Sequence, residues 1–66
     1  MKVHLDEKND ALYLRLDDSI IFESEEVSPG IVIDFNDKNQ VVGIEILNVK
    51  TRIPNTKFKK IQFEIS

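Results

Sequence analysis

The residues with the clearest chemical potential are carboxylates around a predicted turn at residues 28–30. Glu23 and Glu25 precede this turn and Asp34 follows it. If the flanking strands pair across the turn, the three side chains share a strand face, where they would suit a hard cation or acid/base catalysis. Catalytic carboxylates usually lie in a concave, partly apolar pocket, which a chain of 66 residues has little room to enclose. We therefore interpret the cluster as a solvated acidic binding face, formed by Glu23, Glu25, Glu26 and Asp34.

Other catalytic arrangements lack the residues that they need. His4 is the only histidine and cysteine is absent, so a histidine metal cage, a Ser/His/Asp relay and a thiolate site all have too few members. No serine lies in a Gly-x-Ser-x-Gly pattern, and two glycines cannot form a phosphate-binding loop. We expect no catalytic residue, no metal ligand and no cofactor. The alternative left open is a metal-binding or hydrolytic protein that uses Glu23, Glu25, Asp34 and His4.

Charge is distributed unevenly along the chain. Residues 1–49 carry eleven Asp/Glu and four Lys/Arg, whereas residues 50–66 carry five Lys/Arg and one Glu. An acidic body disfavours nonspecific attraction to phosphate backbones, so nucleic acid is not an expected partner. The basic tail leaves one exception, because its cations surround Phe58 and suit nucleic acid or an acidic protein surface. These cations are Lys50, Arg52, Lys57, Lys59 and Lys60.

The elements that must position these side chains are strands. Apolar and polar residues alternate with period two through most of the chain, which is typical of strands with one buried face. The expected strands are residues 2–6, 11–16, 20–27, 31–35, 41–47 and 61–65. Short connections predict an antiparallel meander of five to six strands, an all-β fold class, with one short helical turn near the C-terminus in residues 54–60. Gly43 predicts a bulge or a close backbone approach.

The length and composition predict one small domain over residues 1–66. The chain is 41% hydrophobic and 32% charged, as folded proteins are. No apolar run exceeds four residues, far below the roughly 20 that cross a bilayer, and no signal segment opens it. We therefore expect no membrane contact and a cytoplasmic location.

The predicted core raises a packing problem. The inward residues of the strands are large and β-branched, but one face of a sheet cannot bury itself. Three arrangements could cover it: a strongly bent sheet that closes as a small barrel or sandwich, residues 49–60 folded across the sheet, or a second copy of the chain packed face to face. We expect a bent sheet with a homodimer interface, because residues 49–60 offer only Val49, Ile53 and Phe58 as cover. An apolar strip on the opposite face would then form the subunit or partner contact, and its members are Tyr13, Ile21, Val32, Val41 and Leu47.

Three blocks of the sequence resemble a known family. The blocks are DALYLRL at residues 10–16, ESEEVSPGIVIDF at 23–35 and VVGIEIL at 41–47. Their order, spacing and residue identities are similar to those of the prokaryotic domain-of-unknown-function family 2283. The resemblance covers residues 3–49. It implies a small intracellular protein with no established activity and supplies no catalytic residue. Some members are encoded beside small toxin-like proteins, so it also implies an antitoxin-like or partner-binding role. The basic tail, residues 50–66, lies beyond the resemblance.

These observations lead to one main functional hypothesis. The chain is interpreted as a non-enzymatic protein-interaction module that homodimerises. Its acidic face would bind a basic or toxin-like protein partner, because an acidic surface attracts positive charge and the chain lacks a catalytic constellation.

Overall fold

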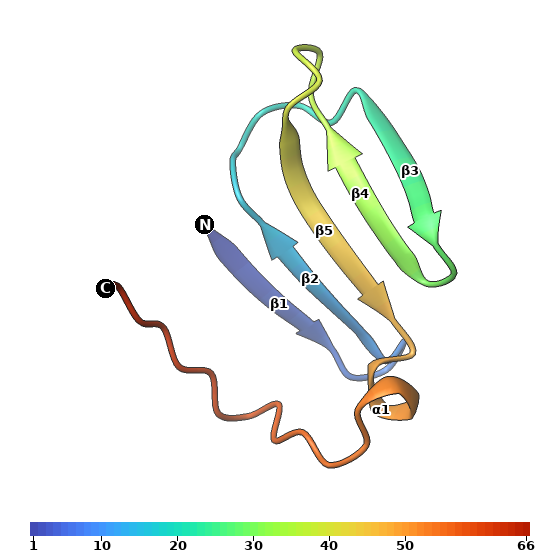
Figure 1. Cartoon of the computed structure of the whole chain (residues 1–66), viewed down its shortest axis with the longest axis vertical. Helices are drawn as coiled ribbons and strands as arrows, with labels where there is room; N and C mark the ends of the chain where they lie inside the picture. The colour runs from blue at the N-terminus through green and yellow to red at the C-terminus, as the bar shows by residue number, and fades with distance from the viewer.

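A five-stranded antiparallel sheet forms the body of the protein. The computed structural model describes residues 1–66. The strands lie in the order β1-β2-β5-β4-β3 across the sheet, and a short helix follows the last strand (Figure 1). The prediction of an all-β, antiparallel fold with one short helical piece near the C-terminus is confirmed. The elements are β1 Lys2–Asp6, β2 Ala11–Arg15, β3 Glu23–Ser28, β4 Ile31–Phe35, β5 Val41–Leu47 and α1 Val49–Arg52.

The sheet consists of two units that meet at its centre. Strands β1 and β2 form one hairpin, and β3, β4 and β5 form a three-stranded meander. The two units join where β2 pairs with β5. The connection at residues 16–22 therefore passes the ends of β5 and β4 to reach β3, so the meander is interrupted once (Figure 1).

Tight turns occur where the sequence predicts them. Asp10, Asn39 and Asn48 have φ angles of 52°, 59° and 55°, and Gly30 has a φ of 79°. Gly adopts this left-handed region without a steric penalty, and Asn and Asp tolerate it better than other residues do. The local turn chemistry thus fixes the hairpins.

Three boundaries differ from the sequence-based expectations. Residues 20–22 form part of a loop, and β3 begins at Glu23. The helical turn lies at Val49–Arg52, ahead of Pro54. The sixth strand predicted at residues 61–65 does not form within the single chain, because this segment is extended but has no ladder partner. Alternating hydrophobicity specifies a two-faced strand, but it does not supply a neighbouring edge.

The register divides the sheet into two chemically distinct faces. On one face, the two cross-strand rows are Val3, Leu14, Ile44, Ile33, Glu25 and Leu5, Leu12, Ile46, Ile31, Ser28. We call the eight apolar members of these rows the apolar face. The opposite face, here the polar face, contains the rows Lys2, Arg15, Gly43, Asp34, Ser24 and His4, Tyr13, Glu45, Val32, Glu26.

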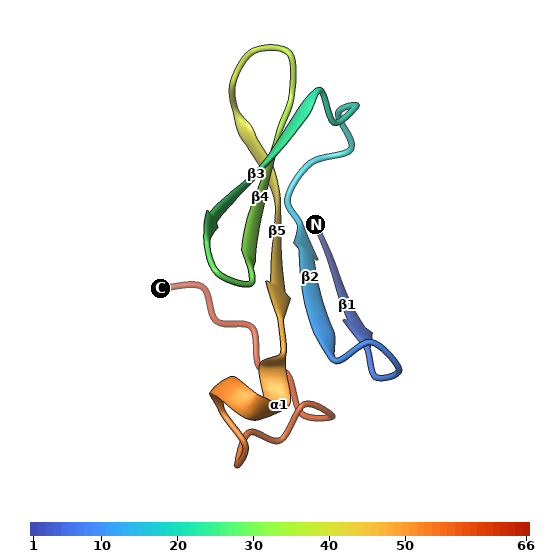
Figure 2. The same cartoon turned by 90° about the vertical axis from the view of Figure 1, so that its right-hand side faces the viewer.

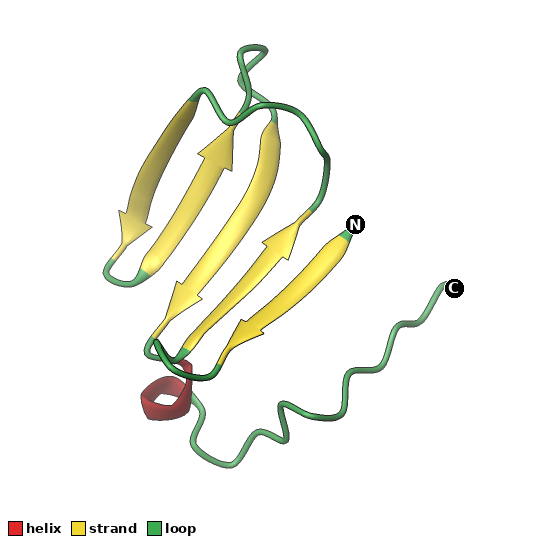
Figure 3. Cartoon of the chain, turned by 180° about the vertical axis from the view of Figure 1, so that it is seen from behind, coloured by secondary structure: helices red, strands yellow, loops and turns green.

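No second layer covers the sheet. Figures 1 and 3 show it from its two sides, and no helix or loop lies across the centre of either. Figure 2 shows the sheet edge-on, with α1 below the strands rather than against them. Ala11, Val42 and Val49 are the only buried apolar residues. The apolar face is therefore only partly shielded, and no member of it is fully buried.

Helix α1 fastens the end of β5 to the turns beside it. The backbone N–H of Lys50 donates to both carboxylate oxygens of Asp10, at 3.1 and 3.3 Å. The Arg52 guanidinium donates to the Leu47 carbonyl at 2.9 Å and also to the Pro29 carbonyl. The helix thus links the turn after β1 with the turn after β3.

The first turn provides a testable pKa shift. The Asn9 side chain donates to Asp6 Oδ2 at 2.8 Å, and its backbone N–H donates to Oδ1 at 3.1 Å. These bonds lower the pKa of Asp6 from 3.8. Since the folded pKa is depressed, the contribution to stability exists above the unfolded pKa and is lost as pH falls through the folded value.

We expect Asn9→Ala to raise the pKa of Asp6 toward 3.8, because the larger of the two causes is the side-chain bond. An NMR titration of the carboxyl carbons measures this change. Asp17 is the internal control, because its pKa is lowered by the Ser19 hydroxyl and does not involve Asn9. An Asp6 pKa that stays unchanged in the variant would contradict the assignment.

Candidate functional site

The polar face contains a hydrogen-bonded group that we call the Asp34 cluster: Tyr13, Arg15, Ser24 and Asp34. The Tyr13 hydroxyl donates to Asp34 Oδ2 at 2.8 Å, and the Ser24 hydroxyl donates to Oδ1 at 2.6 Å. Arg15 Nη1 donates to the Tyr13 hydroxyl at 3.3 Å. Asp34 is only 8% exposed, yet both of its carboxylate oxygens have a donor. The cluster therefore meets the requirement that buried polar groups be paired.

Gly43 makes this cluster possible. Tyr13 on β2 and Asp34 on β4 lie on either side of β5, and Gly43 stands between them. A Cβ at Gly43 would lie 2.6 Å from the Tyr13 hydroxyl and 2.8 Å from Asp34 Oδ2, closer than real Cβ contacts. Of the two features predicted at Gly43, a bulge or a close backbone approach, the structure has a register shift beside it, between the pairs Asp34–Gly43 and Phe35–Val41. The groups that approach Gly43 closely are side chains rather than backbone. The cluster joins β2, β4 and β3 and passes over β5 at Gly43.

The arrangement of the cluster favours structure over chemistry. Arg15 also donates to the carbonyls of Asp17 at 2.6 Å and of Ser19, so it holds the loop before β3. The hydrogen bond to Tyr13 raises the pKa of Arg15 above its ordinary value, which keeps the guanidinium charged. Ser24 donates to a carboxylate and has no histidine beside it to act as a base. The cluster has no activated nucleophile.

The predicted acidic face is divided between the two sides of the sheet. Strands β3 and β4 pair as expected, but Asp34 lies opposite Ser24, and Glu25 lies opposite Ile33. The expectation that Asp34 shares a face with Glu23 and Glu25 is therefore wrong. The cause is a bulge at Val27, where the register shifts by one residue between Glu26 and Ser28. A shift of one residue moves every later side chain to the opposite face.

The three glutamates of β3 nevertheless form a continuous acidic edge. All six residues of β3 are exposed, and the strand lies at the outer side of the sheet. Glu23 and Glu25 share a side with the apolar face, whereas Glu26 shares the polar face with Asp34. We call β3 the acidic edge below.

The members of the predicted apolar contact strip are not contiguous. Tyr13 and Val32 lie on the polar face, but Glu45 separates them in the same cross-strand row. Ile21 lies in the loop before β3, and Val41 lies at a bulge opposite Phe35. Leu47 pairs with Ala11 at the end of β5. A contact role for this strip stays a prediction.

The side chains predicted for a metal-binding or hydrolytic site do not lie together. His4 lies on the polar face opposite Tyr13, in the row that ends at Glu26 on the far edge. No three His, Cys, Asp or Glu residues lie close enough to hold a metal ion. The division of Glu23, Glu25 and Asp34 between two faces removes the arrangement on which that alternative depended.

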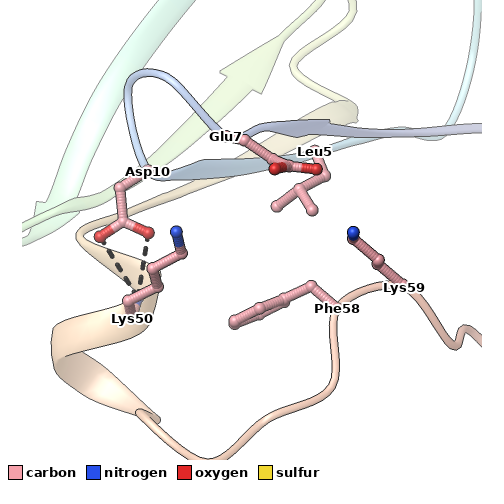
Figure 4. A pocket seen from close by; sticks show the side chains of 6 residues that line it. All are labelled: Leu5, Glu7, Asp10, Lys50, Phe58 and Lys59. Carbon is pink, nitrogen blue, oxygen red and sulfur yellow. Dashed lines mark hydrogen bonds between the residues drawn. The ribbon is translucent and has the colours of Figure 1, made fainter.

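A small pocket of about 180 Å³ lies where the tail passes the first turn. Figure 4 shows Leu5 and Phe58 facing one another, with Glu7 and Lys59 on one side and Asp10 and Lys50 on the other. The Asp10 carboxylate is already engaged by the backbone of Lys50. The pocket is therefore a small hollow between the first turn and the tail, with Leu5 and Phe58 as its apolar lining and charged side chains around them.

The apolar face is the remaining candidate surface. A groove of about 270 Å³ borders it, between Val3 and Leu12 of the sheet and Ile53, Phe58 and Ile61 of the tail. The tail thus covers only the margin at β1 and β2. The middle of the face, around Ile44 and Ile33, has no covering segment (Figure 1).

Comparison with known protein families finds one whose model matches the sequence of this chain. The family model described as "Protein of unknown function (DUF2283)" matches residues 2–50. The chain belongs to this family. The resemblance seen in the sequence is thereby confirmed, and the DUF2283 match ends within α1, so the residues after it are not covered. No curated protein and no solved structure matches the chain.

No helix is long and apolar enough to cross a membrane.

Sequence reasoning missed the Asp34 cluster, because it treated Tyr13 as part of an apolar strip and Asp34 as solvated. The available signal was Gly43, an unexplained glycine within a strand.

We expect Gly43→Ala to destabilise the fold by about 1–3 kcal/mol, because the new methyl group overpacks the Tyr13–Asp34 contact. Urea unfolding followed by circular dichroism, at fixed protein concentration, measures the loss. In a Tyr13→Phe background the hydroxyl is absent, so the same substitution should cost less. Equal costs in the two backgrounds would show that Gly43 does not act by making room for this hydroxyl.

Proposed function

We propose that this DUF2283 domain is a non-enzymatic protein-interaction module that works as a homodimer through its apolar face. The observation that carries the proposal is the pair of apolar rows, which crosses four strands without a polar side chain or a covering layer. A sheet with one apolar face is stable only when that face packs against another element. The single chain has no element for this purpose.

A second copy suits this face better than an unrelated partner. The face is uniform in composition, since all eight members are Val, Leu or Ile. Aliphatic side chains from two sheets can interdigitate at a sheet separation of about 10 Å, as in β-sandwiches. An isologous dimer uses the same patch twice, so a patch without charge meets no repulsion from its copy. Two copies would thereby build one closed core.

The acidic edge supports a second binding role for a basic protein segment. Strand β3 carries three glutamates within four residues, and its outer backbone groups have no partner. An exposed edge of this kind can accept an extended segment as an additional strand, and its charge favours a basic one. An antitoxin-like function toward a basic partner would use this edge, which remains outside the two apolar rows.

We expect Ile33→Lys to shift the protein to a monomer, because the ammonium group would be buried without water at the centre of the interface. In the free sheet the new lysine lies opposite Glu25, which supports the fold of the monomer. Sedimentation equilibrium measures the change as a loss of dimer mass at micromolar concentration.

Val32→Lys is the matched control for this experiment. Val32 is the neighbouring residue on the same strand but lies on the polar face, opposite Glu26 and Glu45. It should leave the dimer intact. Dissociation by Val32→Lys alone would place the interface on the strip that contains Tyr13 and Val32, and a monomeric wild-type protein would refute the homodimer.

A further inference from the structure

We infer that residues 53–66, here the C-terminal arm, pair with the acidic edge of the second copy and complete its sheet as a sixth strand. This inference rests on the proposed homodimer and adds which segment binds the free edge. It joins three features that the single chain leaves separate: an unpaired apolar arm, an unpaired strand edge and opposite charges on the two.

The arm has the pattern of a strand but no strand neighbour. Ile61, Phe63 and Ile65 alternate with polar residues and are 64%, 73% and 85% exposed. Its backbone bonds are all local: Ile53 donates to Val49 at the end of α1, Thr56 to Ile53 and Lys60 to Lys57. Three large apolar side chains in a row on one side of an extended segment are a surface that gains stability from burial.

The arm and the acidic edge lie at opposite ends of the sheet in one chain. Phe58 and Ile61 contact the margin near β1, and the arm then continues outside β1 (Figure 1). Strand β3 is the other edge, four strands away. The lysines of the arm, Lys57, Lys59 and Lys60, therefore cannot reach the glutamates of their own β3 from this position.

The symmetry of a face-to-face dimer decides whether they meet between copies. A two-fold axis parallel to the strands places β1 of one copy over β3 of the other, so each arm lies beside the partner's acidic edge. An axis across the strands places β1 over β1, which brings the two basic arms together and separates them from the glutamates. Opposite charges attract and like charges repel, so the charge distribution favours the first arrangement.

Chain direction and length also fit this arrangement. Strands β1 and β3 point the same way, because each pair between them is antiparallel. In Figure 1 the arm lies outside β1 and runs in the opposite direction. With a two-fold axis parallel to the strands, the arm is therefore antiparallel to the partner's β3. The segment between α1 and residue 61 is eight residues long and spans up to about 26 Å, whereas packed sheets lie about 10 Å apart.

The side chains of the acidic edge match those of the arm. Glu23 and Glu25 point to the same side as the apolar face, and Glu25 lies directly beside Ile33. An added antiparallel strand would place the apolar arm residues along the side of Glu23, Glu25 and Ile33, and would bring Lys59 and Lys60 to the end of the edge that contains Glu26 and Ser28. The outer N–H and C=O groups of β3 would then gain ladder partners.

Two charge-reversed variants test the inference. One carries Glu23→Lys and Glu25→Lys, and the other carries Lys57→Glu, Lys59→Glu and Lys60→Glu. We expect each variant alone to dimerise about tenfold more weakly than wild type at low salt, since several exposed pairs become repulsive. Mixed in equal amounts, they should form a heterodimer of nearly wild-type affinity, because every arm again meets an edge of opposite charge.

The matched control keeps the charge change but moves it away from the acidic edge. Asp37→Lys with Glu45→Lys adds the same positive charge in the loop after β4 and on the polar face. This variant should neither weaken the dimer nor be rescued by mixing. Weakening by the control as strong as that at Glu23 and Glu25 would attribute the effect to net charge and overturn the inference.

Hydrogen exchange provides a readout of the added strand. Amides within residues 61–65 should be protected in the dimer and lose that protection in the Glu23/Glu25 variant. Unprotected amides in a wild-type dimer, or a dimer unaffected by either charge reversal, would overturn the arm exchange and leave the homodimer standing. A wild-type protein that is monomeric would instead remove the homodimer and the arm exchange together.

Discussion

A single sheet cannot bury its own apolar face, and this constraint governs the molecule. The two rows from β1 to β4 hold eight aliphatic side chains, yet only Ala11, Val42 and Val49 are buried in the chain. Hydrophobic burial is the main favourable term in folding, so a domain that leaves its largest apolar surface open is incomplete alone. The proposals of a homodimer and of an exchanged arm both start from this single-layer architecture.

The polar face solves the opposite problem. It faces away from the proposed interface and is held by the Asp34 cluster, whose hydrogen bonds cross four strands. Gly43 removes one side chain from the central strand so that Tyr13 and Asp34 can meet above it. The polar face thus holds the strands together through directional hydrogen bonds, and the apolar face is the surface proposed for association.

Much of the fold could be predicted because its signals are local. Alternation over 11–16, 31–35 and 41–47 reports which side chains share a face, and turn residues such as Asp10 and Gly30 report where the chain reverses. The candidate site was harder to predict. A single bulge at Val27 moves Asp34 away from Glu23 and Glu25, and no residue type in that segment announces the bulge. From the sequence alone Tyr13 is assigned to an apolar strip, because the partner of its hydroxyl, Asp34, is far away along the chain.

The sequence by itself determined the antiparallel strands, the apolar and polar sides of each strand and the separation of the acidic body from the basic tail. Tertiary structure alone decided that β2 pairs with β5, that Asp34 is buried against Tyr13 and Ser24, and that residues 61–65 have no neighbour within the chain. The reason is physical. Strand periodicity and turn chemistry act over a few adjacent residues, whereas register and pairing depend on contacts between segments far apart in the sequence.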